Sequence, residues 1–368
     1  MKTEMAIDCF FEPVKIKNLN LKNRFVMAPM SYYKNIGGVP NDEFVEYHRS
    51  RAAGDLGLTI TGATGIDRPA SNNHPCLANI NRDTSDMWRK VVEQAHSVGG
   101  PIVLQLWHAG PLFNVAPDWT PAPIESPSGI LKPGEIVGKP MTDEQIQDCV
   151  ETFSASAALA MEIGFDTVEI HAAHGFLIDS FFWDETNRRN DRWGGSTLPE
   201  RSQFAVEVVR AVRAAIGDQA ALLMRVSQWK EQDYDVKLAK NPDELQAWLG
   251  PFVDAGVDIL DCSQRRFWEP EFDGSDLNFA GWVKKILGVP TITVGSVGLS
   301  NDVMTFFEGE KAQRRPLDDL IRRLERGDFD LVAIGRVLMA DPEWIMKIRA
   351  GREDELRELQ MSDLDVGF

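Results

Sequence analysis

The chain has 368 residues, a length that suits either two average domains or one large barrel. Its 56 acidic and 39 basic residues give a formal net charge of −17, which argues against non-specific binding to nucleic acid or anionic membranes. The four cysteines (Cys9, Cys76, Cys149 and Cys262) are far apart and form no CxxC motif, so we expect neither a metal or iron–sulfur site nor a disulfide framework.

No apolar stretch approaches the roughly 20 residues that a membrane-spanning helix needs. The first ten residues contain acids and lack the basic and apolar regions of a secretory signal peptide. We therefore expect a soluble, cytoplasmic protein that binds neither nucleic acid nor membranes. The sequence leaves open whether it is a monomer or a homo-oligomer.

Short apolar and β-branched runs recur along the chain, and a helical pattern follows each of them. The runs are almost continuously hydrophobic, as expected of parallel strands that are buried on both faces. The predicted strands are 25–30, 58–62, 102–106, 167–171, 221–226, 258–263, 291–295 and 331–336.

Helix starts lie between these strands. Residues 41–43 and 83–86 open the first two helices, and Thr142 with Gln145 forms a capping box for the third. Prolines mark further helix starts at Pro199, Pro242 and Pro342.

Eight alternations of strand and helix predict an α/β fold, a (β/α)₈ TIM barrel in a single domain. The barrel is expected over about residues 25–350, with a charged C-terminal tail over 351–368. A doubly wound sheet is the second possibility, and it is less favoured because no GxGxxG motif follows the first strand.

Two segments do not belong to this alternation. Residues 14–17 and 21–24, joined by 18–20, predict a β-hairpin that covers the bottom of the barrel. Residues 107–141, which are rich in Pro, Gly, Ser and Trp, form a long loop after strand 3. Long loops are uncommon unless they build a site, and this one is expected at the catalytic end of the barrel.

Polar and small residues gather at the predicted strand ends. Glycines follow the seventh and eighth strands, where TIM barrels commonly bind phosphate through backbone N–H groups. Taken singly, Gly295 could be a simple turn residue and Arg225 could pair with a neighbouring acid, but seven of eight strand ends share this pattern. The strand-end residues include Ala28, Pro29, Met30, Ser31, Ala63, Gln105, Trp107, His171, Arg225, Gly295, Ser296, Gly335 and Arg336.

His171 and His174 follow the fourth predicted strand, and Gly175 comes directly after them. Two neutral imidazoles at a strand exit can donate two convergent N–H bonds to one oxygen of a ligand. An isolated HxxH pair also fits a metal site or a structural role in bridging loop backbone.

These motifs, in this order, resemble the old yellow enzyme family of FMN-dependent ene-reductases, also called NADH:flavin oxidoreductases. The resemblance covers almost the whole chain, and as a set its motifs are specific. They are Phe11-Glu12-Pro13, Leu21-Lys22-Asn23-Arg24, Ala28-Pro29-Met30-Ser31, Gln105-Leu106-Trp107-His108-Ala109-Gly110, Glu169-Ile170-His171-Ala172-Ala173-His174-Gly175, the segment 187–196, Glu200-Arg201 and Ile334-Gly335-Arg336.

The resemblance implies an FMN that lies across the top of the barrel. Ala28, Pro29, Met30, Ser31 and Ala63 would contact the flavin ring, with Ser31 at its O4/N5 edge. Gln105 would bond the pyrimidine edge and Arg225 would lie near N1 and O2, where a fixed cation stabilises the reduced flavin. Gly295, Ser296, Gly335 and Arg336 would hold the phosphate, which agrees with the position of their strands.

The resemblance also implies a ping-pong reaction. NADH or NADPH gives hydride to flavin N5, and an activated alkene (an α,β-unsaturated carbonyl compound) or a nitro compound then takes it. His171 and His174 would bind the substrate oxygen, with His171 also close to the flavin. Hydrogen bonds to that oxygen strengthen as it gains negative charge, so they stabilise the transition state more than the ground state.

The chain departs from the family pattern at three positions. Phe176 stands where relatives commonly have the tyrosine that protonates the α-carbon, so we expect Tyr33, or else solvent, to take that role. Pro111 stands where relatives often have arginine. The segment 308–315 is charged and suggests a longer loop on the surface or at a subunit contact. The substrate pocket is expected to contain Tyr33, Trp107, Phe176 and Arg266, of which Arg266 fits either an anion contact or a salt-bridged loop.

We therefore predict an NAD(P)H:flavin oxidoreductase with bound FMN and no metal, which acts on small molecules. Two alternatives belong to other classes. A metal-dependent TIM-barrel hydrolase or lyase would use the histidine pair as ligands, although no carboxylate or cysteine partner is evident. A non-catalytic ligand-binding barrel would explain Phe176, although every inferred cofactor position is present.

Overall fold

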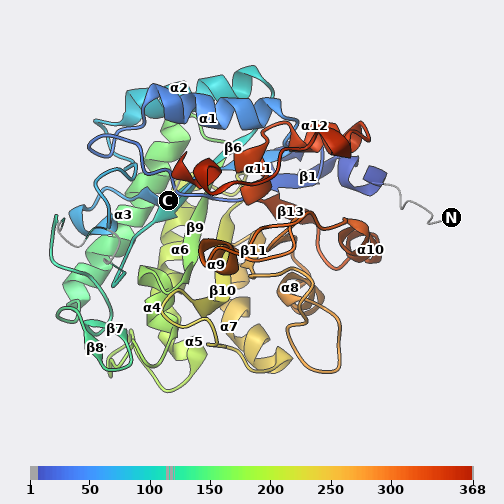
Figure 1. The fold of residues 1–368 in the computed structure, drawn as a ribbon. Helices are drawn as coiled ribbons and strands as arrows, with labels where there is room; N and C mark the ends of the chain where they lie inside the picture. The colour runs from blue at the N-terminus through green and yellow to red at the C-terminus, as the bar shows by residue number, and fades with distance from the viewer. Residues whose placement is uncertain (1–6, 113–115, 117–118, 120, 367–368) are drawn as a thin grey trace.

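The core of the protein is a closed barrel of parallel strands surrounded by helices (Figure 1). A computed structural model describes residues 7–112, 116, 119 and 121–366. Within these residues eight parallel strands follow one another round the barrel, and β4 pairs with β6 to close it. In chain order they are β3 (Phe25–Met27), β4 (Leu58–Ile60), β6 (Ile102–Trp107), β9 (Thr167–His174), β10 (Leu223–Lys230), β11 (Ile259–Ser263), β12 (Thr291–Val294) and β13 (Leu331–Ile334). The predicted (β/α)₈ TIM barrel is confirmed.

Helices cover the outside of the barrel. The longer ones are α1 (Asp42–Ala53), α2 (Ser85–Ser97), α3 (Asp143–Ile163), α6 (Gln203–Ile216), α7 (Pro242–Ala255), α8 (Phe279–Leu287) and α10 (Asp318–Arg326). Shorter helices lie in the loops or close to the C-terminus: α4 (Leu177–Phe182), α5 (Leu198–Arg201), α9 (Val303–Phe307), α11 (Arg336–Ala340) and α12 (Trp344–Arg349). A two-residue strand, β5 (Thr64–Gly65), extends the sheet beside β6.

The helix starts follow from local hydrogen bonding. Asn41 caps α1 by accepting a bond from the Phe44 N–H, and Asn241 caps α7, which begins at Pro242. The predicted capping box of α3 is present, because Thr142 and Gln145 each bond the other's backbone N–H. These caps satisfy N–H groups that have no partner within the helix.

The inside of the barrel is packed by every second residue of each strand. Val26, Leu58, Val103, Leu223 and Ile259 belong to one buried apolar cluster that fills the lower part of the barrel. Leu19 and Leu21 of the N-terminal hairpin belong to the same cluster. The hairpin therefore covers the bottom of the barrel, as predicted.

The predicted boundaries of that hairpin are wrong in its second strand. β1 (Val14–Ile16) pairs with β2 (Leu19–Leu21), whereas residues 21–24 were expected to form the second strand. Lys17, with φ of 48°, begins a tight two-residue turn. This shorter turn sets the register so that both leucines of β2 face the barrel and Asn20 faces solvent.

The long loop after β6 is anchored by buried charges. His108 accepts a bond from the Gly110 N–H through Nδ1, and its Nε2 lies 2.8 Å from Glu125 Oε2. Arg68 donates two bonds, of 2.6 and 2.7 Å, to the same carboxylate. The loop also contains a small hairpin of β7 (Ile130–Lys132) and β8 (Glu135–Ile136). Residues 113–115, 117–118 and 120 of the predicted segment lie outside the described residues.

The predicted C-terminal tail packs against the barrel over much of its length. Leu356, Leu359 and Leu364 are buried in the main hydrophobic cluster. Arg314 donates to the carbonyl oxygens of Glu353 and Leu356, which fixes the chain between them. The charged residues around these leucines, such as Glu353, Asp354 and Arg357, are exposed.

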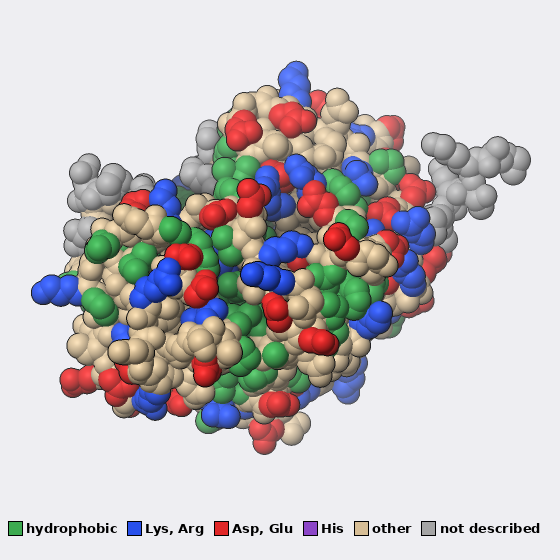
Figure 2. Space-filling view, turned by 90° about the horizontal axis from the view of Figure 1, so that it is seen from below, with side chains coloured by type: hydrophobic (Ala, Val, Ile, Leu, Met, Phe, Trp, Pro, Cys, Tyr) green, Lys and Arg blue, Asp and Glu red, His purple; other side chains and the backbone are tan. Residues whose placement is uncertain are grey.

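The surface has charges of both signs. On the face shown in Figure 2, acidic and basic side chains are interspersed around groups of hydrophobic side chains. In the described part of the chain, no helix combines the length and apolar character needed to cross a bilayer.

Leu21→Ala should destabilise the fold strongly, because it opens a cavity between the hairpin and the barrel interior. Leu21 is 1% exposed, and loss of a buried leucine costs about 2–5 kcal/mol. The measurement is the free energy of unfolding in urea. Ile136→Ala is the control, since Ile136 is 78% exposed and should change the value by less than about 0.5 kcal/mol. Equal effects of the two substitutions would contradict the role of the hairpin.

Candidate active site

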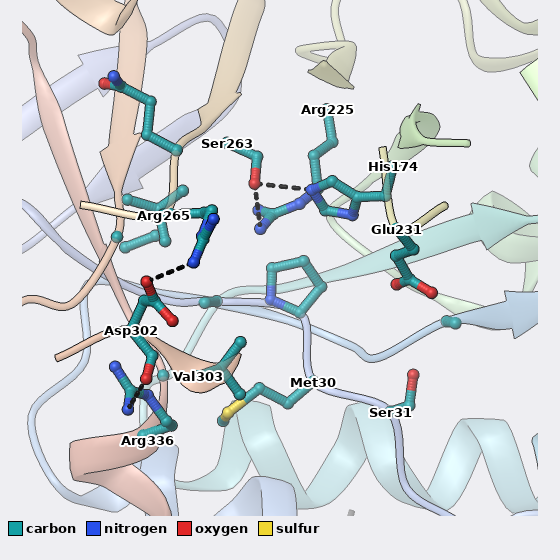
Figure 3. Close-up of a pocket in the computed structure, with 18 of the residues that line it drawn as sticks. Met30, Ser31, His174, Arg225, Glu231, Ser263, Arg265, Asp302, Val303 and Arg336 are labelled. Carbon is teal, nitrogen blue, oxygen red and sulfur yellow. Dashed lines mark hydrogen bonds and ion pairs between the residues drawn. The ribbon is translucent and has the colours of Figure 1, made fainter. Parts of the chain in front are cut away.

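A cavity of about 300 Å³ opens at the carboxyl ends of the barrel strands. It collects residues from loops and strands that are far apart in the sequence (Figure 3). All but one of the predicted site residues line it: Ala28, Pro29, Met30, Ser31, Tyr33, Ala63, Gln105, Trp107, His171, His174, Phe176, Arg225, Gly295, Ser296, Gly335 and Arg336.

The exception is Arg266. Among the described residues the cavity is lined by its neighbour Arg265, while Arg266 forms ion pairs with Asp302 and Glu269, at 2.8 and 2.9 Å. Successive residues after a strand point in different directions, so the loop after β11 presents only one of the two arginines to the cavity. Of the two readings that the sequence allowed for Arg266, the salt-bridged loop fits the structure.

β9 delivers both histidines to the cavity. His171 continues the inward alternation of the strand, and the backbone then turns at His174, whose φ of 65° is in the left-handed region. A β-strand would have turned His174 outward, so this turn is what brings its ring beside that of His171. The ring centroids are 5.3 Å apart and the ring planes are inclined by 77°.

A buried ion pair supports this turn. Lys230, at the end of β10, lies in register with His174, and its Nζ is 2.7 Å from Asp179 Oδ1. The other oxygen of Asp179 accepts a bond of 2.5 Å from the Gly175 N–H. Both side chains are fully buried, so removal of either one would leave an unpaired charge beneath the site.

The two histidines have different hydrogen-bond partners. His171 Nδ1 accepts a weak bond of 3.4 Å from the Ala173 N–H, which leaves the proton on Nε2. His174 Nε2 lies 2.7 Å from Ser263 Oγ (Figure 3). Arg225 also donates to Ser263, at 3.4 Å, and since a guanidinium can only donate, the serine proton is available to His174. This network favours the proton of His174 on Nδ1.

Burial and the nearby guanidinium keep both rings uncharged. Burial, helped by Arg225, lowers the pKa of His171 to about 3, and the same causes lower the pKa of His174 well below its usual value. Near neutral pH both imidazoles are therefore neutral and can donate one N–H bond each. Trp229 stacks on His174 with centroids 4.3 Å apart, which fixes the plane of that ring.

One end of the cavity contains a cation without an anionic partner. Arg336 donates to the carbonyl oxygens of Asn301 and Asp302, at 2.5 and 3.2 Å, and to Ser296 Oγ at 3.3 Å. No carboxylate bonds to it within the described residues. Burial lowers the pKa of Arg336 to about 10, as expected of a guanidinium whose charge is incompletely balanced.

The backbone at this end leaves room for a ligand. Gly295 has φ of 131°, and a Cβ there would come within 2.5 Å of the Gln264 carbonyl oxygen. A Cβ on Gly335 would instead point at Met30 Sδ, 3.3 Å away in the cavity floor. Only glycine fits the first position, and the second keeps the floor open beside Arg336.

The opposite end is aromatic and contains one acid. Phe176 packs edge-on against both Trp107 and His171, with centroids 5.2 and 5.1 Å apart. Tyr33 lines the same region, and burial together with the charge of Glu231 raises its pKa. Glu231 is exposed at the cavity mouth, and the loss of water around its carboxyl group on the cavity side raises its pKa. Figure 3 shows the Glu231 carboxyl group in the cavity between His174 and Ser31.

The sequence analysis missed seven polar residues that line the cavity: Asn73, Glu231, Tyr234, Ser263, Gln264, Arg265 and Asp302. Ser263 could have been found, because it ends the predicted sixth strand and shares the inward face with Asp261. Glu231 could not, because β10 runs four residues beyond its predicted end. Asp302 caps α9 and binds Arg265 at 2.8 Å, a contact that only the folded loops create.

Comparison with known proteins identifies the family. The family model described as "NADH:flavin oxidoreductase / NADH oxidase family" matches residues 9–355. The chain belongs to this family. The resemblance to the old yellow enzymes is confirmed.

Relatives differ in length. A 12-oxophytodienoate reductase 7 from Oryza sativa subsp. japonica is 38% identical, over 92% of this chain and 87% of that protein. An NADPH dehydrogenase from Bacillus subtilis is 31% identical, over 90% of this chain and 91% of that protein. An NADH oxidase from Thermoanaerobacter brockii is also 31% identical, but this chain spans only 52% of its length.

Solved structures agree with the fold. Morphinone reductase superposes with a TM-score of 0.77 at 26% identity, covering 96% of this chain and 92% of that chain. A second structure of morphinone reductase is a complex with tetrahydroNAD, with the same TM-score. An old yellow enzyme homologue from Zymomonas mobilis, at 23% identity and a TM-score of 0.79, supports the fold alone.

FMN is the cofactor of the family, and the cavity fits it. Small or flat residues such as Ala28, Pro29 and Ala63 leave space for a planar ring, and Arg225 lies at one edge of that space. Arg336, with no anionic partner among the described residues, suits a phosphate group beside Gly335. In the described chain no group of three or more His, Cys, Asp or Glu side chains is arranged to hold a metal ion.

Proposed function

We propose that this chain is an FMN-dependent oxidoreductase that uses NADH or NADPH to reduce activated alkenes or nitro compounds by a ping-pong reaction. The observation on which the proposal rests is the pair of neutral imidazoles in one cavity with Arg225 and Arg336. The relatives named 12-oxophytodienoate reductase and cinnamate reductase support an alkene as the acceptor. Bound FMN supplies the redox chemistry, by taking hydride from the nicotinamide and giving it to the acceptor.

The protein's own residues then have separate roles. We propose that His171 and His174 donate hydrogen bonds to the substrate oxygen, and that these bonds strengthen as negative charge develops there. Ser263 and Trp229 hold the His174 ring in place. Ala28, Pro29, Met30, Ser31, Ala63, Gln105 and Arg225 would contact the flavin, while Gly295, Ser296, Gly335 and Arg336 would hold its phosphate. Trp107 and Phe176 provide an apolar wall that excludes water.

The proposal predicts a yellow protein. The purified chain should show flavin absorbance, which NADH or NADPH should bleach under anaerobic conditions and which an enone such as 2-cyclohexenone should then restore. The two half-reactions are measured separately by stopped-flow absorbance. A colourless protein that takes up no FMN on incubation would overturn the proposal, and so would activity that a chelator abolishes.

Arg336→Met should weaken FMN binding without affecting riboflavin, which has no phosphate. Loss of charge-assisted bonds worth about 1.5–3 kcal/mol corresponds to roughly a 10- to 150-fold increase in the FMN Kd. Both affinities are measured by fluorescence titration of the flavin-free chain. Arg352→Met is the matched control, because Arg352 is exposed and forms a surface ion pair with Glu355. An equal loss of riboflavin affinity would mean that Arg336 supports the loop rather than the phosphate.

Tyr33→Phe tests the proton donor that we propose for the α-carbon. The alkene half-reaction should slow by about 10²–10⁴-fold, because a positioned general acid is lost, while reduction by NAD(P)H should change little. The control is Tyr32→Phe, since the Tyr32 ring points away from the cavity and packs against Phe44.

The alkene half-reaction should slow as pH rises through about 7. Glu231 is neutral below its raised pKa and negative above it, and its negative charge makes the Tyr33 proton harder to release. Glu231→Gln should therefore remove this pH dependence. If Glu231→Gln abolishes the step while Tyr33→Phe leaves it unchanged, Glu231 is the donor and the role of Tyr33 is wrong.

A further inference from the structure

A polar layer crosses the barrel directly beneath the cavity. It consists of Gln105 on β6, Glu169 on β9, Arg225 on β10 and Asp261 on β11, and each side chain is at most 7% exposed. Gln105 lies in register with Glu169, and Arg225 lies in register with Asp261. Glu169 and Asp261 stand on alternate strands, and alternate strands of such a barrel contribute side chains to the same interior layer.

The charges of this layer do not balance if both acids are ionised. Arg225 is its only cation within the described residues, and it forms an ion pair with Asp261. The other titratable groups nearby, His171 and His174, are neutral. The inward residues of the remaining strands, such as Ile60, Val294 and Ala333, are apolar. Two carboxylates would therefore leave one negative charge uncompensated in the interior, which is costly.

The hydrogen bonds of this layer also indicate that a proton is missing between the two acids. Glu169 Oε1 accepts a bond of 2.8 Å from Gln105 Nε2, and Asp261 Oδ2 accepts the bond from Arg225. The remaining oxygens, Glu169 Oε2 and Asp261 Oδ1, are both buried and receive no donor from the described residues. Buried acceptors almost always have a donor. One proton placed between the two carboxyl groups would satisfy both oxygens at once.

We propose that Glu169 and Asp261 share a single proton, which Glu169 holds and donates to Asp261, so that the layer beneath the cavity is neutral at physiological pH. Burial and the charge of Asp261 raise the pKa of Glu169 to about 8, which agrees with this assignment. Glu169 and Asp261 then act as positioning residues for Arg225. One carboxylate orients the guanidinium, and no second negative charge cancels its attraction for an anion above it.

The proton links the layer to the ligand. An anionic group bound over Arg225 competes with Asp261 for the same cation, so its binding should increase the affinity of the acid pair for the proton. Conversely, loss of the proton above about pH 8 adds a negative charge to the layer and should weaken the binding of reduced FMN, whose ring carries negative charge near N1 and O2. This second consequence rests on the proposed function, whereas the shared proton itself does not.

Infrared spectroscopy of the whole chain tests the proton directly. At pH 7 the difference spectrum between the wild-type chain and Glu169→Gln should contain a carbonyl stretch of a protonated carboxylic acid that shifts in D₂O. The subtraction removes the bands of other acids with a raised pKa, such as Glu231. The same band should disappear in Asp261→Asn, because Glu169 then becomes the only acid available to Arg225 and ionises. Glu135→Gln is the control, since Glu135 is exposed and its substitution should leave the band in place. The absence of this band from the difference spectra of both the Glu169 and the Asp261 variants would overturn the proposal.

Flavin binding provides the second readout. Between pH 7.5 and 9, under anaerobic conditions, the Kd of the wild-type chain for reduced FMN should rise by up to tenfold per pH unit above the pKa of Glu169, and that of Glu169→Gln should not follow this rise. If the Kd of Glu169→Gln has the same pH dependence as that of the wild type, the shared proton does not control flavin binding. If the chain binds no FMN, the proposed function fails, but the infrared result still decides whether the proton is shared.

Discussion

The structure depends on one geometric constraint: eight parallel strands close into a barrel, and their inward-facing side chains fill its interior. Only every second residue can point inward, and the carboxyl ends of all strands meet at one mouth. The lower layers are therefore apolar and closed by Leu19 and Leu21, while the upper layers are polar. Every group of the candidate site owes its position to this closure.

Within that frame, the distribution of buried charge decides which groups remain available to a ligand. Lys230 is matched by Asp179, and Arg265 by Asp302. Arg336 bonds only neutral acceptors among the described residues, and Arg225 faces an acid pair whose shared proton would leave just one negative charge. The cavity thus contains one guanidinium group, that of Arg336, with no anionic partner among the described residues, and a second, that of Arg225, which Asp261 also binds, although the chain as a whole has a net charge of −17.

The departure from the family pattern at Phe176 does not damage the site. Its ring fills the space between Trp107 and His171, so the apolar wall is complete. What is lost is a hydroxyl group, and the structure places Tyr33 and Glu231 in the same cavity. The strained backbone at His174, the stacked Trp229 and the Ser263 bond show that the second histidine is held in one orientation. Such strain persists only where the surrounding structure enforces it.

The sequence by itself determined the barrel, the hairpin beneath it and sixteen of the residues that line the cavity, because hydrophobic period, helix caps and strand-end motifs are local signals. It misplaced the second hairpin strand, where a two-residue turn set the register, and it placed Arg266 in the pocket, where the structure has Arg265. Only the tertiary structure decided the contacts of Ser263, Glu231 and Asp302, and the pairing of Glu169 with Asp261. These contacts join strands and loops far apart in the chain, and their charges and protons are set by burial, which no local pattern records.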